Sequence, residues 1–458
     1  MTKLLPTSLI TASIVATGLM ASFFTAAASN HISLAQVTKD VTYLASDDLK
    51  GRGNFSPEIK KAANYIAKRF EENGLIGAKG IAAQGYLQKY SITKISSDKL
   101  NVMVNGQNID AENLAIASNA KNISWQIVKG VKNTNFNIHT VSEDDDMRAT
   151  LGDINKQGGE HLILLHPAQK AIFTRYQNYF ARGLTKPASQ NDSASNGGTI
   201  VVALSDITSD KVTSVNVTAT NTVSSSELTN VIAVLPGKTK PNEIVLYSAH
   251  YDHLGVKNAE GDNIYNGADD DASGTTAIIN IAQHYAKQGN NARTLMFAAF
   301  SAEEIGGFGS QYFSKQLDPN TITAMINIEM IGKPSKFGAG TIWMTGMERS
   351  NLGEQLNQVL AESGNEIYKD PYPEQGLFYR SDNATLARLG VPAHSFSSTQ
   401  LDKDQHYHNV SDDLASLNLP SLHKVIEALA TATQPLVDGS ITPSRIDINK
   451  IKNNGLIY

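Results

Sequence analysis

Short apolar runs alternate with amphipathic segments through the second half of the chain. Runs rich in β-branched and other apolar residues, typical of buried strands, occupy 231–235, 244–248, 294–300, 324–328, 341–344 and 391–396. Segments with apolar residues three or four positions apart, which predict helices, occupy 275–288, 309–316, 352–363 and 419–436. This alternation predicts an α/β fold in which a mixed, largely parallel sheet is sandwiched between helices.

The stretch from 94 to 228 interrupts that alternation. It is rich in Asn, Ser and Thr and carries an acidic run from Glu143 to Asp146. Two apolar runs of strand type, at 162–165 and 199–204, indicate that it folds. We therefore expect an inserted domain, and the predicted organisation is a main domain over 29–93 and 229–438, an insertion over 94–228 and a surface tail over 439–458.

The first residues have the layout of a secretory signal peptide. Lys3 precedes a mostly apolar stretch from Leu4 to Phe24, and small residues follow up to Ser29. Thr and Ser residues inside the stretch make it a poor permanent membrane span. We expect residues 1–28 to be removed and the mature chain to be exported to the periplasm or the medium, with no stable membrane span.

Composition narrows the chemistry that the chain can perform. It has 458 residues, 39 Lys and Arg against 44 Asp and Glu, and a net charge of -5, so it lacks the basic excess of a nucleic-acid-binding protein. It contains no cysteine, which excludes disulfides, thiolate nucleophiles and cysteine-ligated metals. Catalysis is therefore left to histidines, carboxylates, hydroxyls or a metal ion.

Polar residues gather where the predicted strands end, which is where open α/β sheets place their sites. The clusters begin at or contain His250, Asp270, the pair Glu303–Glu304, Glu329 and His408. Buried carboxylates cost several kcal/mol each unless they are paired or bind a cation, so acidic clusters converging on one sheet edge indicate a cation site. Histidines mixed with carboxylates suit Zn²⁺ or a similar divalent ion, and five such ligands favour a two-metal centre over one tetrahedral ion.

The clusters resemble the motifs of a known enzyme family. The matching stretches are His-Tyr-Asp from His250, Gly-Ala-Asp-Asp-Asp-Ala-Ser-Gly from Gly267, Glu303–Glu304, Asn-Ile-Glu-Met-Ile-Gly from Asn327, and Tyr-His-Asn-Val-Ser-Asp from Tyr407. In order and spacing they resemble the secreted di-zinc exopeptidases of metallopeptidase family 28, which include bacterial leucyl aminopeptidases, aminopeptidase Y and plasma glutamate carboxypeptidase. The resemblance covers about residues 40–90 and 228–432.

The resemblance assigns roles to individual residues. It implies two Zn²⁺ ions, or other divalent ions, bridged by Asp270. One ion would also take His250 and Glu329, and the other Glu304 and His408. Glu303 would be the general base, and the family pattern also implies a cis peptide bond after Asp270. The implied activity is that of an aminopeptidase, a zinc-dependent hydrolase that removes N-terminal residues from peptide substrates.

Other residues near these motifs invite more specific expectations. Asp252 and Asp412 fit acceptors that orient the imidazoles of His250 and His408. Tyr379 is the candidate residue of the substrate pocket, although a packed aromatic is the more common role for such a residue. Four further polar neighbours are expected to act otherwise: Asp269 and Asp271 as helix-cap or loop residues, and His253 and His406 as structural or rim residues.

Some features depart from the family pattern. The position of Glu329 is commonly Asp in the family, and Asn383 stands where a histidine is common. A protease-associated domain is the family's usual insertion at 94–228, but no diagnostic motif of it is present here. Three alternatives use the same fold: a glutaminyl cyclase-like transferase with one zinc, a carboxypeptidase, and a non-catalytic peptide-binding module.

Overall fold

The computed structural model describes Met1 and residues 32–80, 85–128, 131–188, 197–257, 260–361, 364–452, 454–455 and 457–458. The expected signal peptide over 1–28 therefore lies outside the described residues, apart from Met1. No helix of the described part of the chain is both long and apolar enough to span a bilayer.

Four parallel strands form the centre of the main sheet. β12 (Lys240–His250) lies between β15 (Arg293–Phe300) and β16 (Ile322–Ile328), and β19 (Ala393–Ser397) pairs with the far side of β16. β15 and β16 are almost wholly buried, as is the second half of β12, and these stretches are largely apolar. β19 is also buried, although His394, Ser395 and Ser397 make it partly polar. The expected mixed, largely parallel sheet is confirmed.

Antiparallel strands extend the sheet on both sides. β11 (Val215–Leu235) joins β15 and continues into β2 (Leu87–Val104) and β3 (Gln107–Ile109). On the other side, β17 (Ile342–Met344) pairs with β19 and carries β18 (Ile367–Lys369). The remaining short strands are β1 (Ile76–Gly77), β6 (Val131–Lys132) and β9 (Leu184–Pro187), which pair with strands of this sheet, and β13 (Gly255–Val256) and β14 (Ile264–Tyr265), which pair with each other.

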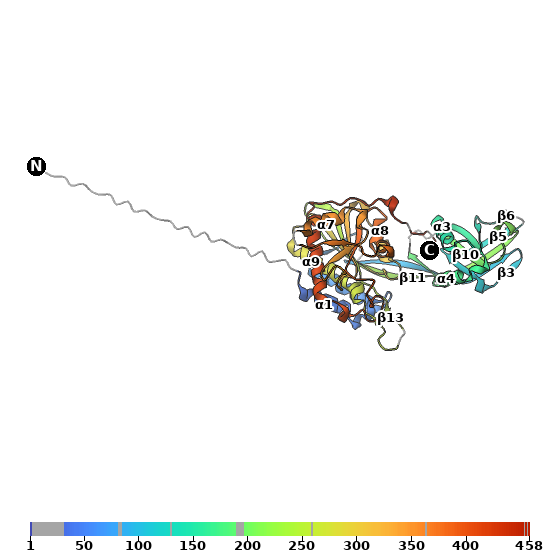
Figure 1. Ribbon diagram of the computed structural model, residues 1–458, viewed down its shortest axis with the longest axis horizontal. Coiled ribbons are helices and arrows are strands. Elements are labelled where there is room, and N and C mark those ends of the chain that lie inside the picture. The colour runs from blue at the N-terminus through green and yellow to red at the C-terminus, as the bar shows by residue number, and fades with distance from the viewer. Residues whose placement is uncertain are drawn as a thin grey trace.

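Helices cover both faces of the central sheet (Figure 1). Along β12, Val245, Tyr247 and Ala249 point into one core and Leu246 into the other. The first core holds α1 (Leu34–Leu44), α2 (Pro57–Glu72), α5 (Gly274–Gln288), α7 (Leu352–Leu360) and α9 (Leu419–Val437). The second holds α6 (Phe308–Ser314) and α8 (Asn383–Ala387).

The segment between β2 and β11 builds a separate lobe (Figure 1). Its sheet has the order β4 (Leu114–Ser118), β10 (Gly198–Leu204), β8 (Gly159–Leu165) and β7 (Asn137–Val141). α3 (Met147–Gln157), α4 (Lys170–Phe180) and β5 (Asn122–Val128) complete the lobe, which has apolar clusters of its own. The long β2–β11 ribbon carries it away from the main body.

The end of the chain returns to this lobe. The side-chain amide of Asn155 donates to the carbonyl of Tyr458 at 2.7 Å, and its oxygen accepts from the amide of Ile457 at 2.8 Å. The Tyr458 ring packs edge-on against Phe180. The C-terminal residues therefore join the main body to the inserted lobe.

Candidate metal centre

The carboxyl ends of the central strands bring the sequence-predicted ligands together. Most of them lie at the end of a buried strand, where the pairing of the sheet fixes the backbone. His250 is the last residue of β12, Glu303 and Glu304 follow β15, Glu329 follows β16, Asp270 precedes α5, and His408 lies in the loop after β19.

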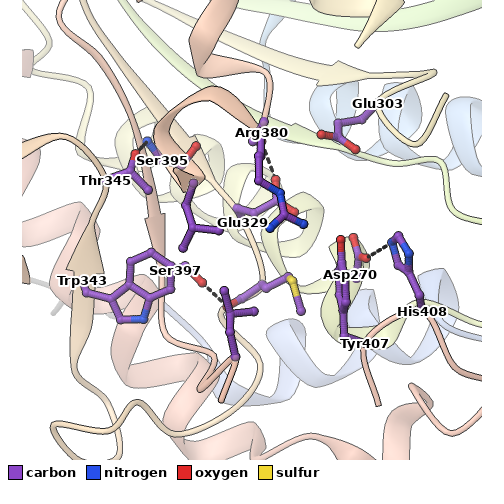
Figure 2. Close-up of a pocket in the computed structure, with 14 residues that line it drawn as sticks. Asp270, Glu303, Glu329, Trp343, Thr345, Arg380, Ser395, Ser397, Tyr407 and His408 are labelled. Carbon is purple, nitrogen blue, oxygen red and sulfur yellow. Dashed lines mark hydrogen bonds and ion pairs between the residues drawn. The ribbon is translucent and has the colours of Figure 1, made fainter. Parts of the chain in front are cut away.

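Asp270 lies between the two histidines. Its Oδ1 is 3.2 Å from Nε2 of His250, and its Oδ2 is 3.3 Å from Nε2 of His408. Figure 2 shows Asp270 and His408 joined in this way on one side of the cavity. One carboxylate thus presents a separate oxygen to each imidazole, which is the arrangement that a bridging ligand needs.

A second carboxylate completes each group. Nε2 of His250 is 3.2 Å from Oε1 of Glu329, and Nε2 of His408 is 3.1 Å from Oε2 of Glu304. Ligand atoms around a tetrahedral zinc ion with bonds of about 2.0–2.1 Å lie about 3.3 Å apart. The histidine-to-carboxylate distances in both groups therefore fit zinc coordination by nitrogen and oxygen donors. The donor atoms of His250, Asp270 and Glu329 all lie within 4.8 Å of one another, and so do those of a second group, His253, Asp270 and Glu304.

His253 makes a different kind of contact. Its Nδ1 is 2.6 Å from Oε1 of Glu304, which is too short for two ligands of one ion, and 3.8 Å from Oδ2 of Asp270. The ring is buried, so His253 is not a rim residue; it touches the Glu304 oxygen that does not face His408. In the sequence, only its position three residues after His250 indicated that His253 would lie near the candidate ligands.

Glu303 faces the cavity instead of the histidines. Figure 2 shows its carboxylate beside the cavity, and its backbone amide donates to Oδ1 of Asp252 at 3.1 Å. Burial raises the pKa of Glu303 well above its usual range, and the neighbouring Glu329 adds to the rise. A carboxylate of raised pKa beside the ligands is suited to accept a proton near neutral pH.

Asp252 orients His250 through its backbone. Nδ1 of His250 lies 3.0 Å from the Asp252 carbonyl and 3.7 Å from the carboxylate. The carboxylate accepts instead from the amides of Glu303 and Glu304 and from Nδ2 of Asn54. Asp252 therefore positions both the imidazole and the Glu303–Glu304 turn.

Asp412 does not have the partner expected for it. Its carboxylate accepts from the backbone amides of Asp269 and Asp270 at 3.1–3.2 Å, so it holds the Asp270 segment instead of the His408 ring. Three residues of loop separate Asp412 from His408, and the backbone turns the carboxylate toward the neighbouring segment. His406 has the structural role expected of it, with Nδ1 2.9 Å from the Ser411 carbonyl.

The two acids beside Asp270 stabilise loop ends. Oδ1 of Asp271 accepts from the amides of Gly274 and Met330, so it caps the start of α5 and ties it to the end of β16. Oδ1 of Asp269 accepts from the amide of Gly332 at 2.7 Å. The peptide bond between Asp270 and Asp271 is cis, as the resemblance implied.

A cavity opens beside these ligands (Figure 2). Its apolar lining is Met330, Trp343, Leu377 and Leu401. Tyr407 also lines it, with its ring stacked on His408 at 3.9 Å, and Arg380 brings a positive charge.

Tyr379 is a packed aromatic and does not line this cavity. Its ring lies edge-on to Phe378, and its hydroxyl accepts from the amide of Lys452 at 3.3 Å. The backbone therefore turns the ring toward the end of the chain. The tyrosine beside the candidate ligands is Tyr407, which precedes His408 in the sequence motif.

The pKa values of the histidines reflect the facing carboxylates. Hydrogen bonds to Asp270 and Glu304 raise the pKa of His408 to about 9. Burial alone lowers the pKa of His250, but Glu329, Asp252 and Asp270 outweigh it and raise that pKa well above 6.5. A divalent ion competes with these protons for the same nitrogen atoms.

A match to a known family agrees with this geometry. Residues 230–433 match the model of peptidase family M28, a segment that contains all five candidate ligands and Glu303. Residues 230–433 are therefore a domain of peptidase family M28.

Curated relatives match the same M28 domain. Leucine aminopeptidase 1 of Ajellomyces dermatitidis is 30% identical over 199 residues, which are 41% of this chain and 51% of the relative. The leucine aminopeptidase 1 of Aspergillus niger is 29% identical over 200 residues, 40% of this chain and 49% of the relative. A probable zinc metalloprotease of Pyricularia oryzae is 27% identical over 184 residues, 34% of this chain and 36% of the relative. The chain thus spans about half the length of these leucine aminopeptidases.

Solved structures share the fold of the M28 chain. A zinc aminopeptidase from Bacillus subtilis aligns with a TM-score of 0.51 and 15% identity, covering 93% of this chain and 99% of that one. An aminopeptidase from Aneurinibacillus sp. strain AM-1 aligns with a TM-score of 0.50 and 18% identity, covering 92% and 97%. These alignments show the fold of the chain.

One departure of the M28 domain from the family pattern has a structural explanation. Asn383 is buried, its Nδ2 donates to the carbonyl of Phe378 at 3.1 Å, and its Oδ1 accepts from Oγ of Ser395 at 2.9 Å. Asn383 therefore fastens α8 to β19 behind the cavity wall.

Proposed function

We propose that this protein is an exported zinc aminopeptidase that hydrolyses the first peptide bond of its substrates. The observation that carries the proposal is the placement of Asp270, whose two oxygens each face a different histidine, with the Glu303 carboxylate beside them. This geometry supports two ions that share Asp270, one on His250 and Glu329 and the other on His408 and Glu304. The curated relatives named leucine aminopeptidases support the reaction.

Zinc bound by these residues supplies an acidified water and polarises the scissile carbonyl. Glu303 accepts the proton of the attacking water at its carboxylate and returns it to the departing amine. Its place beside the ligands, with a raised pKa, supports both transfers. Asp252 supports the reaction by holding the amide of Glu303.

The cavity beside the ligands receives the side chain of the N-terminal residue. Its wall of Met330, Trp343 and Leu401 supports a preference for apolar side chains. The ring of Tyr407 closes the side next to His408.

The position of Arg380 favours a second candidate function, that of a carboxypeptidase. It lines the cavity, and a guanidinium there would attract a substrate carboxylate, as a carboxypeptidase requires. The aminopeptidase is preferred because of the relatives' activity and the apolar remainder of the wall. Release of C-terminal residues from blocked peptides would decide for the carboxypeptidase.

The test is the release of a chromophore from aminoacyl anilides by purified enzyme. Activity should disappear with a strong chelator and return with zinc, and metal analysis should give two ions per chain. One ion per chain together with cyclisation of N-terminal glutamine would indicate a glutaminyl cyclase-like enzyme. Tight peptide binding with neither metal nor hydrolysis would indicate a binding module.

The proposal also covers export and domain organisation. Cleavage near residue 28 would deliver the chain to the periplasm or medium, with a catalytic domain over 29–93 and 229–438 interrupted by the insertion 94–228. N-terminal sequencing of the protein recovered from periplasm and medium tests the cleavage, and an unprocessed, cell-associated chain would contradict it.

A further inference from the structure

A buried lysine lies behind the candidate metal centre and meets three carboxylates. Nζ of Lys333 is 3.0 Å from Asp404, 3.4 Å from Asp269 and 3.4 Å from Asp412. Lys333 is only 9% exposed, and the side chains of its three partners are almost wholly buried. Burying such a group is costly unless its geometry is good and hydrogen bonds satisfy the remaining polar atoms.

The three carboxylates belong to the two segments that carry metal-ligand candidates. Asp404 and Asp412 lie on either side of His408 in one loop, and Asp269 directly precedes Asp270. Lys333 itself stands four residues after Glu329, in the loop that follows β16. One ammonium group therefore contacts both ends of the His408 loop and the Asp270 segment.

The neighbouring hydrogen bonds strengthen this link. Asp412 accepts from the amides of Asp269 and Asp270, and its own carbonyl accepts from the amide of Ala268 at 3.0 Å. Asp404 accepts from the amide of His406 at 3.2 Å. His408 has a positive φ of 55°, so the loop must be held in an uncommon conformation to point its ring at Asp270.

We infer that Lys333 is a positioning residue that sets the distance between His408 and Asp270 and so tunes the affinity of one of the two metal ions. The inference rests on the proposed function, because it needs two ions. Without the ammonium, three buried carboxylates would repel one another and the His408 loop would move away from Asp270. The ion on His250 and Glu329 would keep its ligands.

The carboxylates keep Lys333 charged. Burial alone lowers the pKa of Lys333, but Asp269, Asp412 and Asp404 outweigh it and raise that pKa above its usual value. The charge is therefore present across the pH range in which a zinc enzyme works.

The experiment compares Lys333→Met with a matched control from the same loop. Zinc or cobalt is titrated into the metal-free full chain against a chromophoric chelator, which resolves two binding steps. Lys333→Met should weaken one step by about 10–100-fold, the usual effect of removing a partner that supports a ligand, and leave the other within about threefold. Lys403→Met, at an exposed position next to Asp404, should leave both steps unchanged.

Two further variants identify which ion is affected. His408→Ala should abolish the step that Lys333→Met weakens, and His250→Ala should abolish the other. Lys333→Arg, which keeps the charge, should recover part of the lost affinity. If Lys333→Met does not fold, Asp404→Asn carries the test, since it removes one contact of the ammonium at constant shape and should weaken the same step.

The results separate failure of this inference from failure of the proposed function. Equal loss of both steps, or two unchanged steps, in Lys333→Met would overturn the positioning role even with a fully active wild type. A wild type that binds fewer than two ions or hydrolyses no aminoacyl anilide would overturn the proposed function, and the inference with it.

Discussion

The guanidinium of Arg52 donates a hydrogen bond to the backbone carbonyl of Asn266 at 2.6 Å, across 214 positions of sequence. Arg52 is fully buried and also donates to the carbonyls of Tyr251 and Gly267, each at 2.8 Å. Tyr251 follows His250, and Gly267 precedes Asp270 by three residues. One side chain from the start of the chain therefore joins the two segments that carry these ligand candidates.

Replacing Arg52 should destabilise the fold. Arg52→Met leaves several buried carbonyls without donors, and the expected loss is about 3 kcal/mol or more of unfolding free energy. Urea unfolding of the metal-free protein measures it. Lys50→Met is the control, because Lys50 is exposed and its ion pair with Glu58 spans 3.7 Å, so a loss within about 1 kcal/mol is expected. Equal losses of unfolding free energy in the two variants would contradict the role of Arg52 in joining the two segments.

Adjacent glutamates should respond differently to the same substitution. Glu303→Gln should keep both ions and lower kcat about 100–10,000-fold, because it removes only the proton acceptor. Glu304→Gln should weaken zinc binding by more than about 100-fold, beyond the effect of losing an outer-shell partner. Anilide hydrolysis and metal content are measured on each variant.

The comparison is internal, since each variant serves as the control for the other. Wild-type kcat in Glu303→Gln would remove Glu303 from the proposed mechanism. Normal metal content in Glu304→Gln would remove Glu304 from the ligands.

The central fold was predictable because buried parallel strands leave a strong sequence signal. β15, β16 and the second half of β12 are largely apolar and buried, and polar clusters mark their ends. The outer half of β11 alternates buried and exposed residues over a stretch rich in Ser and Thr, so its apolar content did not distinguish it from loop. Pairing with β2 from Val215 to Val231, which sequence does not display, makes it a strand.

The candidate ligands were predictable and most of their supports were not. Motif spacing identified His250, Asp270 and Glu304 because each lies beside a strand or helix end. Arg52 and Lys333 carry no such mark, because a buried charge is defined by partners distant in sequence. Their partners became visible only when the chain was folded.

The cavity wall predicts a preference among N-terminal side chains. One methylene in an apolar pocket changes kcat/KM about 10–200-fold, so leucyl anilide should exceed alanyl anilide by at least about tenfold. Leu401→Ala should reduce that ratio, because Leu401 lines the cavity. Leu389→Ala, at an exposed position outside the cavity lining, should not change it. An unchanged ratio in Leu401→Ala would place the N-terminal side chain elsewhere.

Zinc binding should release protons at pH values above the pKa of an ordinary histidine. In the metal-free protein, Asp270 and Glu304 raise the pKa of His408 to about 9, against about 6.5 in an unfolded chain. The protonated ring therefore stabilises the metal-free fold fully below about pH 6.5, and this contribution is lost as pH rises through about 9. At pH 7.5 the ring still carries its proton, which zinc must displace.

Calorimetric zinc titrations in buffers of different ionisation enthalpy measure that release. The number of protons released should stay high at pH 7.5 and fall as pH passes 9, while zinc affinity should keep rising until the same pH. His408→Gln should release fewer protons at pH 7.5, since the glutamine has none to lose. Release that ends near pH 6.5 in the wild type would mean that the two carboxylates do not hold the His408 proton.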